Sequence, residues 1–219
     1  MTENIMAHRI LAFGPFRLHG DTVLMSLIIT GLLLGLAYAA TRRMKVIPGP
    51  LQGLVEILVE FLEKMAAENI GAHGRIYLPF FATLFIFIFF ANMLGLIPGL
   101  KSPTADVNFT FGLAVAVMLA MQYASIRTHG FIGWLTHFFR PNFLFFVIHL
   151  LEMVTRPLTL ALRLFGNIFA GEVLIIILYS LAPVVVPTLW LALSVVIGVI
   201  QAYIFTVLSM AYTGMAVEE

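Results

Sequence analysis

Cysteine is absent from the 219 residues, and charged residues are scarce, with Lys and Arg numbering 12 and Asp and Glu 11. The absence of cysteine excludes disulfides and thiolate metal sites. A net charge of +1 leaves no basic footprint of the kind that binds nucleic acid. Average soluble domains carry about 25% charged residues, against 11% here. The composition therefore excludes an ordinary soluble domain, and we expect neither a metal nor a cofactor.

Hydrophobic residues make up 61% of the chain, and the mean hydropathy is +1.04. The apolar runs are longer than the alternating strands of about 10 residues that build a membrane barrel. Only helices remain as spanning elements, because their backbone groups are satisfied within one segment. The sequence predicts an all-α integral membrane protein with about five membrane-embedded helices and one amphipathic surface helix.

The chain is interpreted as a single membrane domain, residues 1–219. Its segments in order are an exposed N-terminal segment (1–21), a first span (22–41), a surface helix (51–70), two further spans (77–97 and 105–127), a short interfacial linker (128–140), and a long hairpin (141–181 and 183–217). The surface helix is predicted because Glu56, Glu60 and Glu63 fall on one side and leucines on the other. Ala37-Tyr-Ala-Ala resembles a signal-peptidase site, which leaves a cleaved signal peptide as an alternative.

The last two segments are too long to stand upright in a bilayer. A helix of about 35–40 residues reaches roughly 55 Å, whereas the hydrocarbon core is about 30 Å thick. Either the helices are steeply tilted or one contains a break, for which Pro157 is the candidate. No polar turn interrupts either run, so a steeply tilted hairpin is the prediction.

Basic residues indicate the orientation. Arg42, Arg43 and Lys45 follow the first span, whereas the loop between the second and third spans has only Lys101. Cytoplasmic loops carry the excess of Lys and Arg. We therefore expect the N-terminus outside and the C-terminus in the cytoplasm.

Arg163 is the residue that most needs an explanation. An arginine at the centre of a membrane helix costs about 2.5–3.5 kcal/mol on insertion scales, and its guanidinium cannot lose its proton to escape that cost. At about 100° per residue, His149, Glu152, Arg156, Asn167 and Ala170 all fall within about 40° of Arg163 on the helix. Glu172 falls on the opposite face, about 13 Å further along the axis. The helix thus carries polar groups on both sides of a cation.

Two other polar residues have open interpretations. Gln201 shares a face of the last helix with Ser194, and it is either a partner for the deep cation or an interhelical hydrogen bond that holds helices together. Asp106 either caps the start of the third span, where a carboxylate is favourable, or belongs to a polar pathway.

Five motifs occur in order along the chain. They are Pro48-Gly-Pro-Leu-Gln52, Asn92-Met-Leu-Gly-Leu-Ile-Pro98, Pro103-Thr-Ala-Asp106-Val-Asn108, Leu162-Arg163-Leu-Phe-Gly-Asn167-(x)3-Gly171-Glu172, and Gln201-Ala-Tyr-Ile-Phe205. Together they resemble subunit a of the bacterial F-type ATP synthase, the membrane stator and proton-channel subunit. The resemblance covers the chain from about residue 20 to its end.

The resemblance implies a stator subunit, not catalytic by itself, in the bacterial inner membrane. It implies two offset half-channels that serve a rotor ring of c subunits, and peripheral-stalk b subunits as further partners. Arg163 would be the essential stator arginine and Gln201 its partner amide. The outer half-channel would be lined by Glu172, Asn167, Asp106 and Asn108, and the inner one by Glu152 and His149. Ser194 stands where some members carry a histidine, so the outer path would depend more on Glu172 and on water.

A self-contained ion-coupled transporter is the main alternative, because buried Arg and Glu also suit that class. The chain has no internal repeat or paired broken helices of the usual transporter kind. A plain assembly anchor would not require Arg163, Glu152, Glu172 and Gln201 along one path. The stator interpretation is therefore preferred.

Overall fold

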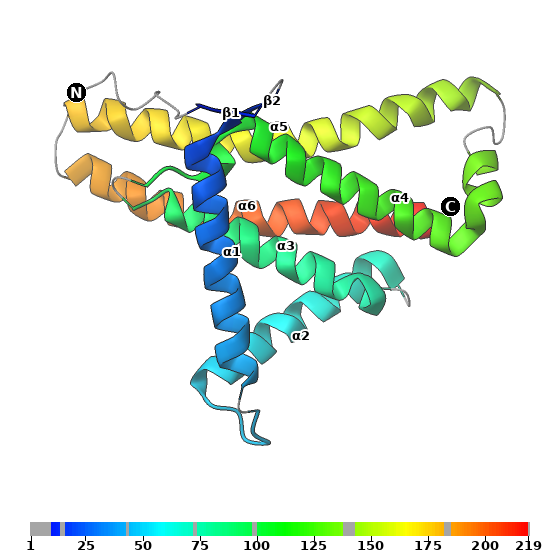
Figure 1. Ribbon diagram of the computed structural model, residues 1–219, viewed down its shortest axis with the longest axis horizontal. Helices are drawn as coiled ribbons and strands as arrows, with labels where there is room; N and C mark the ends of the chain where they lie inside the picture. Colours follow the sequence, from blue (N-terminus) through cyan, green and yellow to red (C-terminus); the bar gives the residue numbers. More distant parts are fainter. Residues whose placement is uncertain are drawn as a thin grey trace.

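The computed structural model describes residues 10–13, 16–42, 44–71, 74–97, 100–137, 143–181 and 185–218. Within these residues the chain is almost entirely helical, as the sequence predicts (Figure 1). Five of the described helices are long and apolar enough to cross a membrane. A sixth, α2, is amphipathic, so the predicted count of spanning helices and the surface helix are both confirmed.

A short antiparallel hairpin precedes the first helix, where the sequence predicted only an exposed segment. Strand β1 (Ile10–Phe13) pairs with β2 (Phe16–His19), with Ile10 opposite His19 and Phe13 opposite Phe16. The hairpin leads directly into α1.

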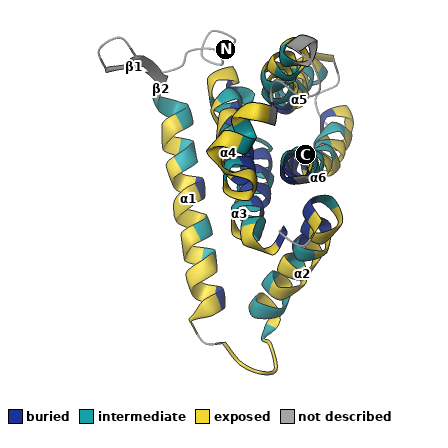
Figure 2. Ribbon diagram, turned by 90° about the vertical axis from the view of Figure 1, so that its right-hand side faces the viewer, coloured by how far each residue is buried: buried dark blue, intermediate teal, exposed yellow. Residues whose placement is uncertain are grey.

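Helix α1 (Gly20–Thr41) lies at one side of the molecule, crosswise to the hairpin helices, and contacts α3, η2 and α2 (Figures 1 and 2). Its 22 residues span about 33 Å, which matches an upright crossing of a hydrocarbon core about 30 Å thick. Of its described side chains only Ile29 and Ala40 are buried. Helix α1 therefore serves as the direction against which the course of the other helices is compared.

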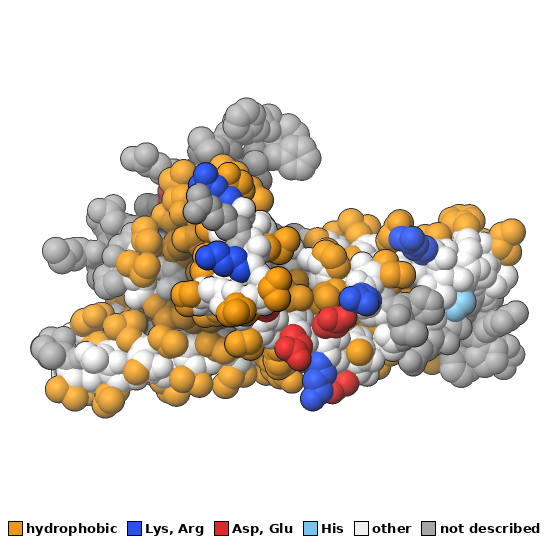
Figure 3. Space-filling view, turned by 90° about the horizontal axis from the view of Figure 1, so that it is seen from below, with side chains coloured by type: hydrophobic (Ala, Val, Ile, Leu, Met, Phe, Trp, Pro, Cys, Tyr) orange, Lys and Arg blue, Asp and Glu red, His pale blue; other side chains and the backbone are white. Residues whose placement is uncertain are grey.

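Helix α2 (Pro50–Ile70) is the predicted amphipathic helix. It begins at a proline, whose missing N–H costs nothing in the first turn, and ends at Gly71, which has a φ of 71°. One face buries Leu62, Met65, Ala66 and Ile70. The other face bears charged side chains, which gather on the underside of the molecule within a largely hydrophobic surface (Figure 3).

Helices α3 (Gly74–Leu94) and α4 (Val107–His137) are joined by a segment that contains the short 3-10 helix η2 (Pro103–Ala105). Helix α4 continues past the predicted end of the span at 127. It kinks at Gly130, where φ is 74°, and residues 131–137 are again helical. Trp134 Nε1 donates to Gln122 Oε1 at 2.8 Å across the kink. The predicted linker is thus a bent helix over 128–137, and residues 138–140 lie outside the described residues.

Helices α5 (Phe143–Leu181) and α6 (Val185–Glu218) form the long hairpin. Helix α5 is continuous through Pro157, so the alternative of a break is excluded. Its 39 residues extend about 58 Å. Both helices run crosswise to α1 in Figure 1 and are seen end-on in Figure 2, which fits the predicted steep tilt. Residues 141, 142, 183 and 184 lie outside the described residues.

The core lies where α2, α3 and α6 meet, with contributions from α4 and α5. One close approach fixes the position of α2 against α6. A Cβ added to Gly214 would lie 1.9 Å from the carbonyl oxygen of Asn69. Only glycine permits this approach, so Gly214 determines how closely the end of α2 packs on α6.

Candidate functional site

A cavity of about 390 Å³ lies between the end of α3, the second half of α5 and the first half of α6; we call it the large cavity. Its polar lining residues are Asn92, Lys101, Asn167, Glu172, Tyr179, Trp190 and Ser194. The remaining lining is mostly aliphatic. A cavity of this size with several convergent polar groups can hold water molecules.

A second space of about 220 Å³, the small cavity, adjoins the start of α1. It is lined by Asp21, Thr22, Lys101, Ser102, Asp106 and Glu172, among others. Lys101 and Glu172 line both cavities. The two spaces therefore meet at this pair of side chains, one a cation and one a carboxylate.

Glu172 is half-buried at this junction. Its Oε1 is fully buried and has no hydrogen-bond partner among the described residues. Two groups outside α5 interact with the Glu172 carboxylate: the backbone of Ser102 through a hydrogen bond, and the ammonium of Lys101 through electrostatic attraction. A buried acceptor without a partner costs free energy unless water or a proton satisfies it. Glu172 is therefore suited to bind a water molecule or a proton from the cavities.

Asp106 is buried at the wall of the small cavity and makes two strong contacts. Its Oδ2 accepts from Thr22 Oγ1 at 2.9 Å, and its Oδ1 accepts from the backbone N–H of Asn108 at 2.9 Å. The second contact is the cap-type bond expected for a residue at a helix start. Both interpretations of Asp106 thus have support, because it begins α4 and also lines a cavity.

Buried hydrogen bonds hold the segment before α4 in place. Ser102 Oγ donates to the carbonyl of Ala91 at 2.9 Å, and Thr104 Oγ1 donates to Asn92 Oδ1 at 2.9 Å. Asn92 Nδ2 in turn donates to the carbonyl of Gly198 in α6 at 3.1 Å. The network connects α3, η2 and α6, so the position of Lys101 is set by the residues that directly follow it.

Gln201 contacts Asn167 across the hairpin. Asn167 Nδ2 donates to Gln201 Oε1 at 2.5 Å. Gln201 is 1% exposed, and its Nε2 has no partner among the described residues. The sequence suggested Arg163 as the partner of this amide, whereas the group that bonds to it is Asn167, one helical turn further along α5.

Arg163 lies on the exposed face of α5. Within the described part of the chain it forms no hydrogen bond and no ion pair. An adjoining side of the helix is anchored in the core by Leu160, Ala161 and Leu164, which are at most 2% exposed. The helix thus presents an unpaired cation to whatever adjoins this face.

Glu152 and Arg156 form an ion pair at 2.5 Å, one turn apart on α5. The Arg156 guanidinium also lies over the ring of Tyr212 in α6, 5.3 Å from its centroid. His149 is half-buried one turn before Glu152. Arg163 lies between this cluster and Glu172, about 16 Å from Glu152 and about 13 Å from Glu172 along the axis.

The structure groups some of the predicted residues and separates others. Asn167, Glu172 and Ser194 line the large cavity, and Asp106 lines the small one. The Asn108 side chain is exposed and lines neither. Ser194 Oγ donates to the carbonyl of Trp190 within its own helix, at 2.8 Å.

Among the lining residues that sequence reasoning did not assign to the site are Lys101, Asp21 and Trp190. The first lies in a polar loop and the second in the segment predicted to be exposed, so periodicity gave no signal for either. Trp190 Nε1 donates to the carbonyl of Gly171 at 3.3 Å. A lone tryptophan within an apolar run was the one available hint, since a buried indole needs an acceptor.

The fold and the site define a class: a multi-pass α-helical membrane protein with polar groups enclosed by a crosswise helical hairpin. Comparison with known proteins is more specific. The family model described as "ATP synthase A chain" matches residues 23–214. The chain belongs to the ATP synthase A chain family.

Curated relatives carry the same name. "ATP synthase subunit a" of Desulforamulus reducens is 45% identical over 201 residues, covering 87% of this chain and 77% of that protein. "ATP synthase subunit a" of Moorella thermoacetica is 40% identical over 203 residues, covering 93% of each chain. "ATP synthase subunit a 3" of Pelobacter propionicus is 40% identical over 203 residues, covering 91% of this chain and 88% of that protein.

Proposed function

We propose that this chain is the proton-translocating stator subunit of an F-type ATP synthase, placed between a rotor ring of c subunits and peripheral-stalk b subunits. The relatives are named as subunits of that complex. Membership of their family favours this role over a self-contained transporter. The chain supplies two offset half-channels and the cation that separates them.

The two cavities form the outer half-channel in this proposal. Asp21 and Asp106 stand in the small cavity, Glu172 at the junction, and Asn167 and Ser194 in the large cavity. The path ends at the Asn167–Gln201 contact, next to the turn that carries Arg163. The carboxylates accept and release protons, and water carries them between fixed groups.

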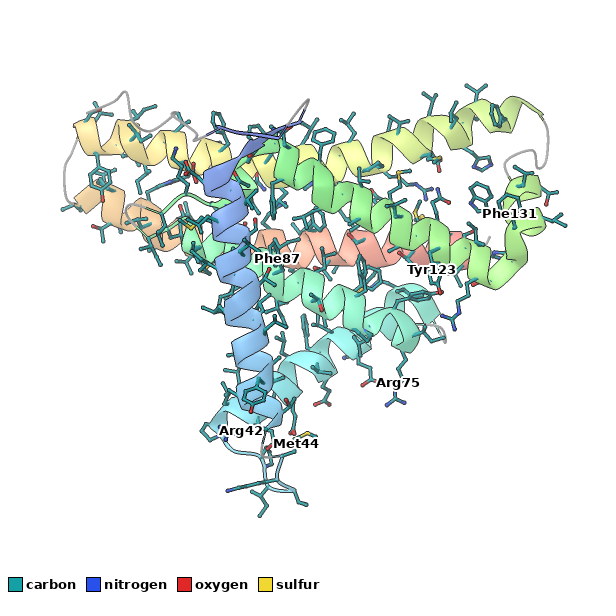
Figure 4. The ribbon with its side chains drawn as sticks, viewed as in Figure 1. Arg42, Met44, Arg75, Phe87, Tyr123 and Phe131 are labelled. Carbon is teal, nitrogen blue, oxygen red and sulfur yellow. The ribbon has the colours of Figure 1, made fainter. Side chains whose placement is uncertain are left out.

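The side of the membrane follows from α1. The small cavity includes Asp21 and Thr22 at the start of α1, whereas Arg42 lies at the opposite end of that helix. Figure 4 places Arg42 and Arg75 on the same, lower side of the molecule. Because basic residues favour the cytoplasmic side, we place the cavities toward the outside and the N-terminus with them. We propose the cytoplasmic side for the C-terminus, as the odd number of membrane-embedded helices predicts.

The observation that carries the proposal is the unpaired Arg163 on the exposed face of α5. Its neighbours on that face, Thr159, Gly166 and Ala170, are small, and nothing lies within 4 Å of a Cβ added to Gly166. Small residues let a second helix approach closely in a membrane. A rotor helix that docks there brings its carboxylate to Arg163.

The physics of the step is electrostatic. A rotor carboxylate must be neutral while it faces lipid, because a charge there is costly. Beside Arg163 the ionised form is stabilised, so the carboxylate gives up its proton to one half-channel. It is reloaded from the other half-channel before it returns to lipid. Each charge moved through 100 mV releases about 2.3 kcal/mol, which the rotor conveys to ATP synthesis elsewhere in the complex.

Glu152, with Arg156 and His149, lines the inner half-channel in this proposal. The Glu152–Arg156 pair lies on the side of Arg163 away from Glu172. Protons cannot pass directly between the two paths, because the cation of Arg163 stands between them. Crossing therefore requires the rotor to turn.

The decisive experiment removes the barrier charge. In membrane vesicles that carry the whole complex, Arg163→Ala and Arg163→Lys should both abolish ATP synthesis, since lysine is a compact point charge that does not reproduce the guanidinium. After the catalytic head is stripped, Arg163→Ala vesicles should take up protons under an imposed potential. A carbodiimide that modifies the rotor carboxylate should block that leak.

Arg75→Ala is the matched control, because Arg75 pairs with Glu63 at an exposed site, where such pairs contribute about 0–1 kcal/mol. Near wild-type ATP synthesis by Arg163→Ala would overturn the proposal. Loss of synthesis with a tight membrane would assign Arg163 to proton release from the rotor and the barrier to another group.

A further inference from the structure

The proposed pathway leaves one charged residue without a role. Lys101 lines both cavities, and it is the one cation among the described residues that line either of them. It is half-buried. Within the described part of the chain it forms no hydrogen bond and no ion pair. Its ammonium does act electrostatically on the Glu172 carboxylate, so its charge bears on the carboxylate where the two cavities adjoin.

The backbone around Lys101 is held firmly. The next residue, Ser102, is 4% exposed and donates its hydroxyl to the carbonyl of Ala91. A Cβ added to Gly95 would lie 2.5 Å from the Cβ of Ser102, so the end of α3 packs directly on this segment. The backbone at Lys101 is therefore held in place, and the lysine lines both cavities.

The charges around that region are mainly negative. Asp21 and Asp106 line the small cavity, and Glu172 lines both. Carboxylates along a water-filled path attract cations of every kind. Asp106 already accepts hydrogen bonds on both oxygens, whereas Glu172 has a buried oxygen without a partner among the described residues. Without a counter-charge, Glu172 is the place at which a small metal cation would settle.

We propose that Lys101 is the ion-selectivity residue of the outer half-channel: its ammonium excludes Na⁺ and similar cations from the junction at Glu172 while protons pass. The inference rests on the proposed function. A metal ion must occupy space beside Glu172 as a charge, and a fixed positive group repels it. The ammonium opposes an excess proton by the same electrostatic repulsion, but a proton forms a covalent O–H bond with the carboxylate, whereas Na⁺ gains only weak coordination. Protons therefore still bind at Glu172 when Na⁺ does not.

The test uses the whole ATP synthase complex in proteoliposomes whose lumen corresponds to the outer side. Synthesis is driven by an acid–base jump, with either NaCl or choline chloride in the lumen at equal ionic strength. The wild type should make ATP equally fast in both salts. Lys101→Met should be about tenfold slower in NaCl than in choline, whatever its rate in choline, because loss of a repelling charge raises the local cation concentration by about that factor.

Two variants serve as controls. Lys101→Arg keeps the charge and should remain insensitive to NaCl. Lys64→Met makes the same substitution at an exposed lysine of α2 and should behave as the wild type does. If Lys101→Met fails to assemble, Lys101→Gln is measured in its place against the same criteria.

The outcomes separate this inference from the proposed function. Equal rates of Lys101→Met in the two salts would overturn the selectivity role while the wild-type rate still supports the stator. Loss of synthesis in both salts with the complex intact would also overturn it, because Lys101 would then be needed for conduction itself. A wild-type complex without ATP synthesis would instead overturn the stator proposal and this inference with it.

Discussion

Replacing Gln201 by leucine should separate stability from function. Gln201 is 1% exposed, its Nε2 is unpaired among the described residues, and its Oε1 accepts one bond from Asn167. The variant removes a buried unsatisfied group, which costs the wild type about 1–3 kcal/mol, and loses one hydrogen bond, which contributes about 0.5–1.5 kcal/mol. Asn167 is exposed, so its freed amide can find another partner. The free energy of unfolding should stay level or rise by up to about 2 kcal/mol.

Function should move in the opposite direction. The amide of Gln201 is the polar link between α6 and the turn of α5 that follows Arg163, and leucine can neither donate nor accept there. We expect ATP-driven proton pumping to fall by about tenfold or more, which corresponds to about 1.4 kcal/mol, the order of one hydrogen bond. Ser194→Ala is the matched control, because its hydroxyl bonds within its own helix, and it should retain most of the pumping.

The two quantities are measured on the same preparations. Thermal unfolding of the purified chain in detergent reports stability, and for a chain of this length about 1 kcal/mol shifts Tm by about 2–4 °C. Acidification of inverted vesicles on addition of ATP reports pumping. A Tm lower by more than about 8 °C, or pumping at the wild-type rate, would refute the reasoning, since the amide would then be either a structural bond or a bystander.

Two further predictions concern the pathway and the packing. Glu172→Gln should reduce ATP synthesis strongly with assembly intact. Glu152→Gln should have a milder effect, because His149 and water share the inner path. Proton pumping in vesicles compares the two variants, and wild-type pumping by Glu172→Gln would contradict the assigned route. Gly214→Ala should destabilise the chain by about 1–3 kcal/mol through overpacking, whereas Gly112→Ala, where nothing lies within 4 Å of the added Cβ, should be neutral or stabilising by up to about 1 kcal/mol. Thermal unfolding in detergent of the two glycine variants checks the pair, and equal Tm values would contradict the close approach of α6 to Asn69.

Features that depend on a single helix were predictable from the sequence. Hydropathy alone located the spanning helices, and the charge pattern of 51–70 located the amphipathic one. The helical period also placed Glu172 on the side of α5 opposite Arg163. These properties follow from residue spacing within one element, so no knowledge of the tertiary arrangement was needed.

Features that depend on several elements were not predictable. Lys101 and Asp21 line the cavities because a loop folds back between α3 and α4 and because α1 stands beside it. The pairing of Gln201 with Asn167 instead of Arg163 depends on the register between α5 and α6, which neither helix encodes alone. The bend at Gly130 was missed because a glycine at this position is equally compatible with a kinked helix and with a turn in a linker.

The crosswise course of α5 changes what a position in this helix means. In an upright span, each residue further along the chain lies about 1.5 Å deeper in the bilayer, and insertion costs depend on that depth. Helix α5 runs crosswise to α1 (Figure 1), so successive residues of α5 are displaced mainly parallel to the membrane plane. Residues as far apart as Glu152 and Glu172 then differ by about 30 Å along the helix but far less in distance from either lipid surface. A substitution scan along α5 therefore samples one layer of the bilayer, and its profile should follow lateral neighbours instead of depth.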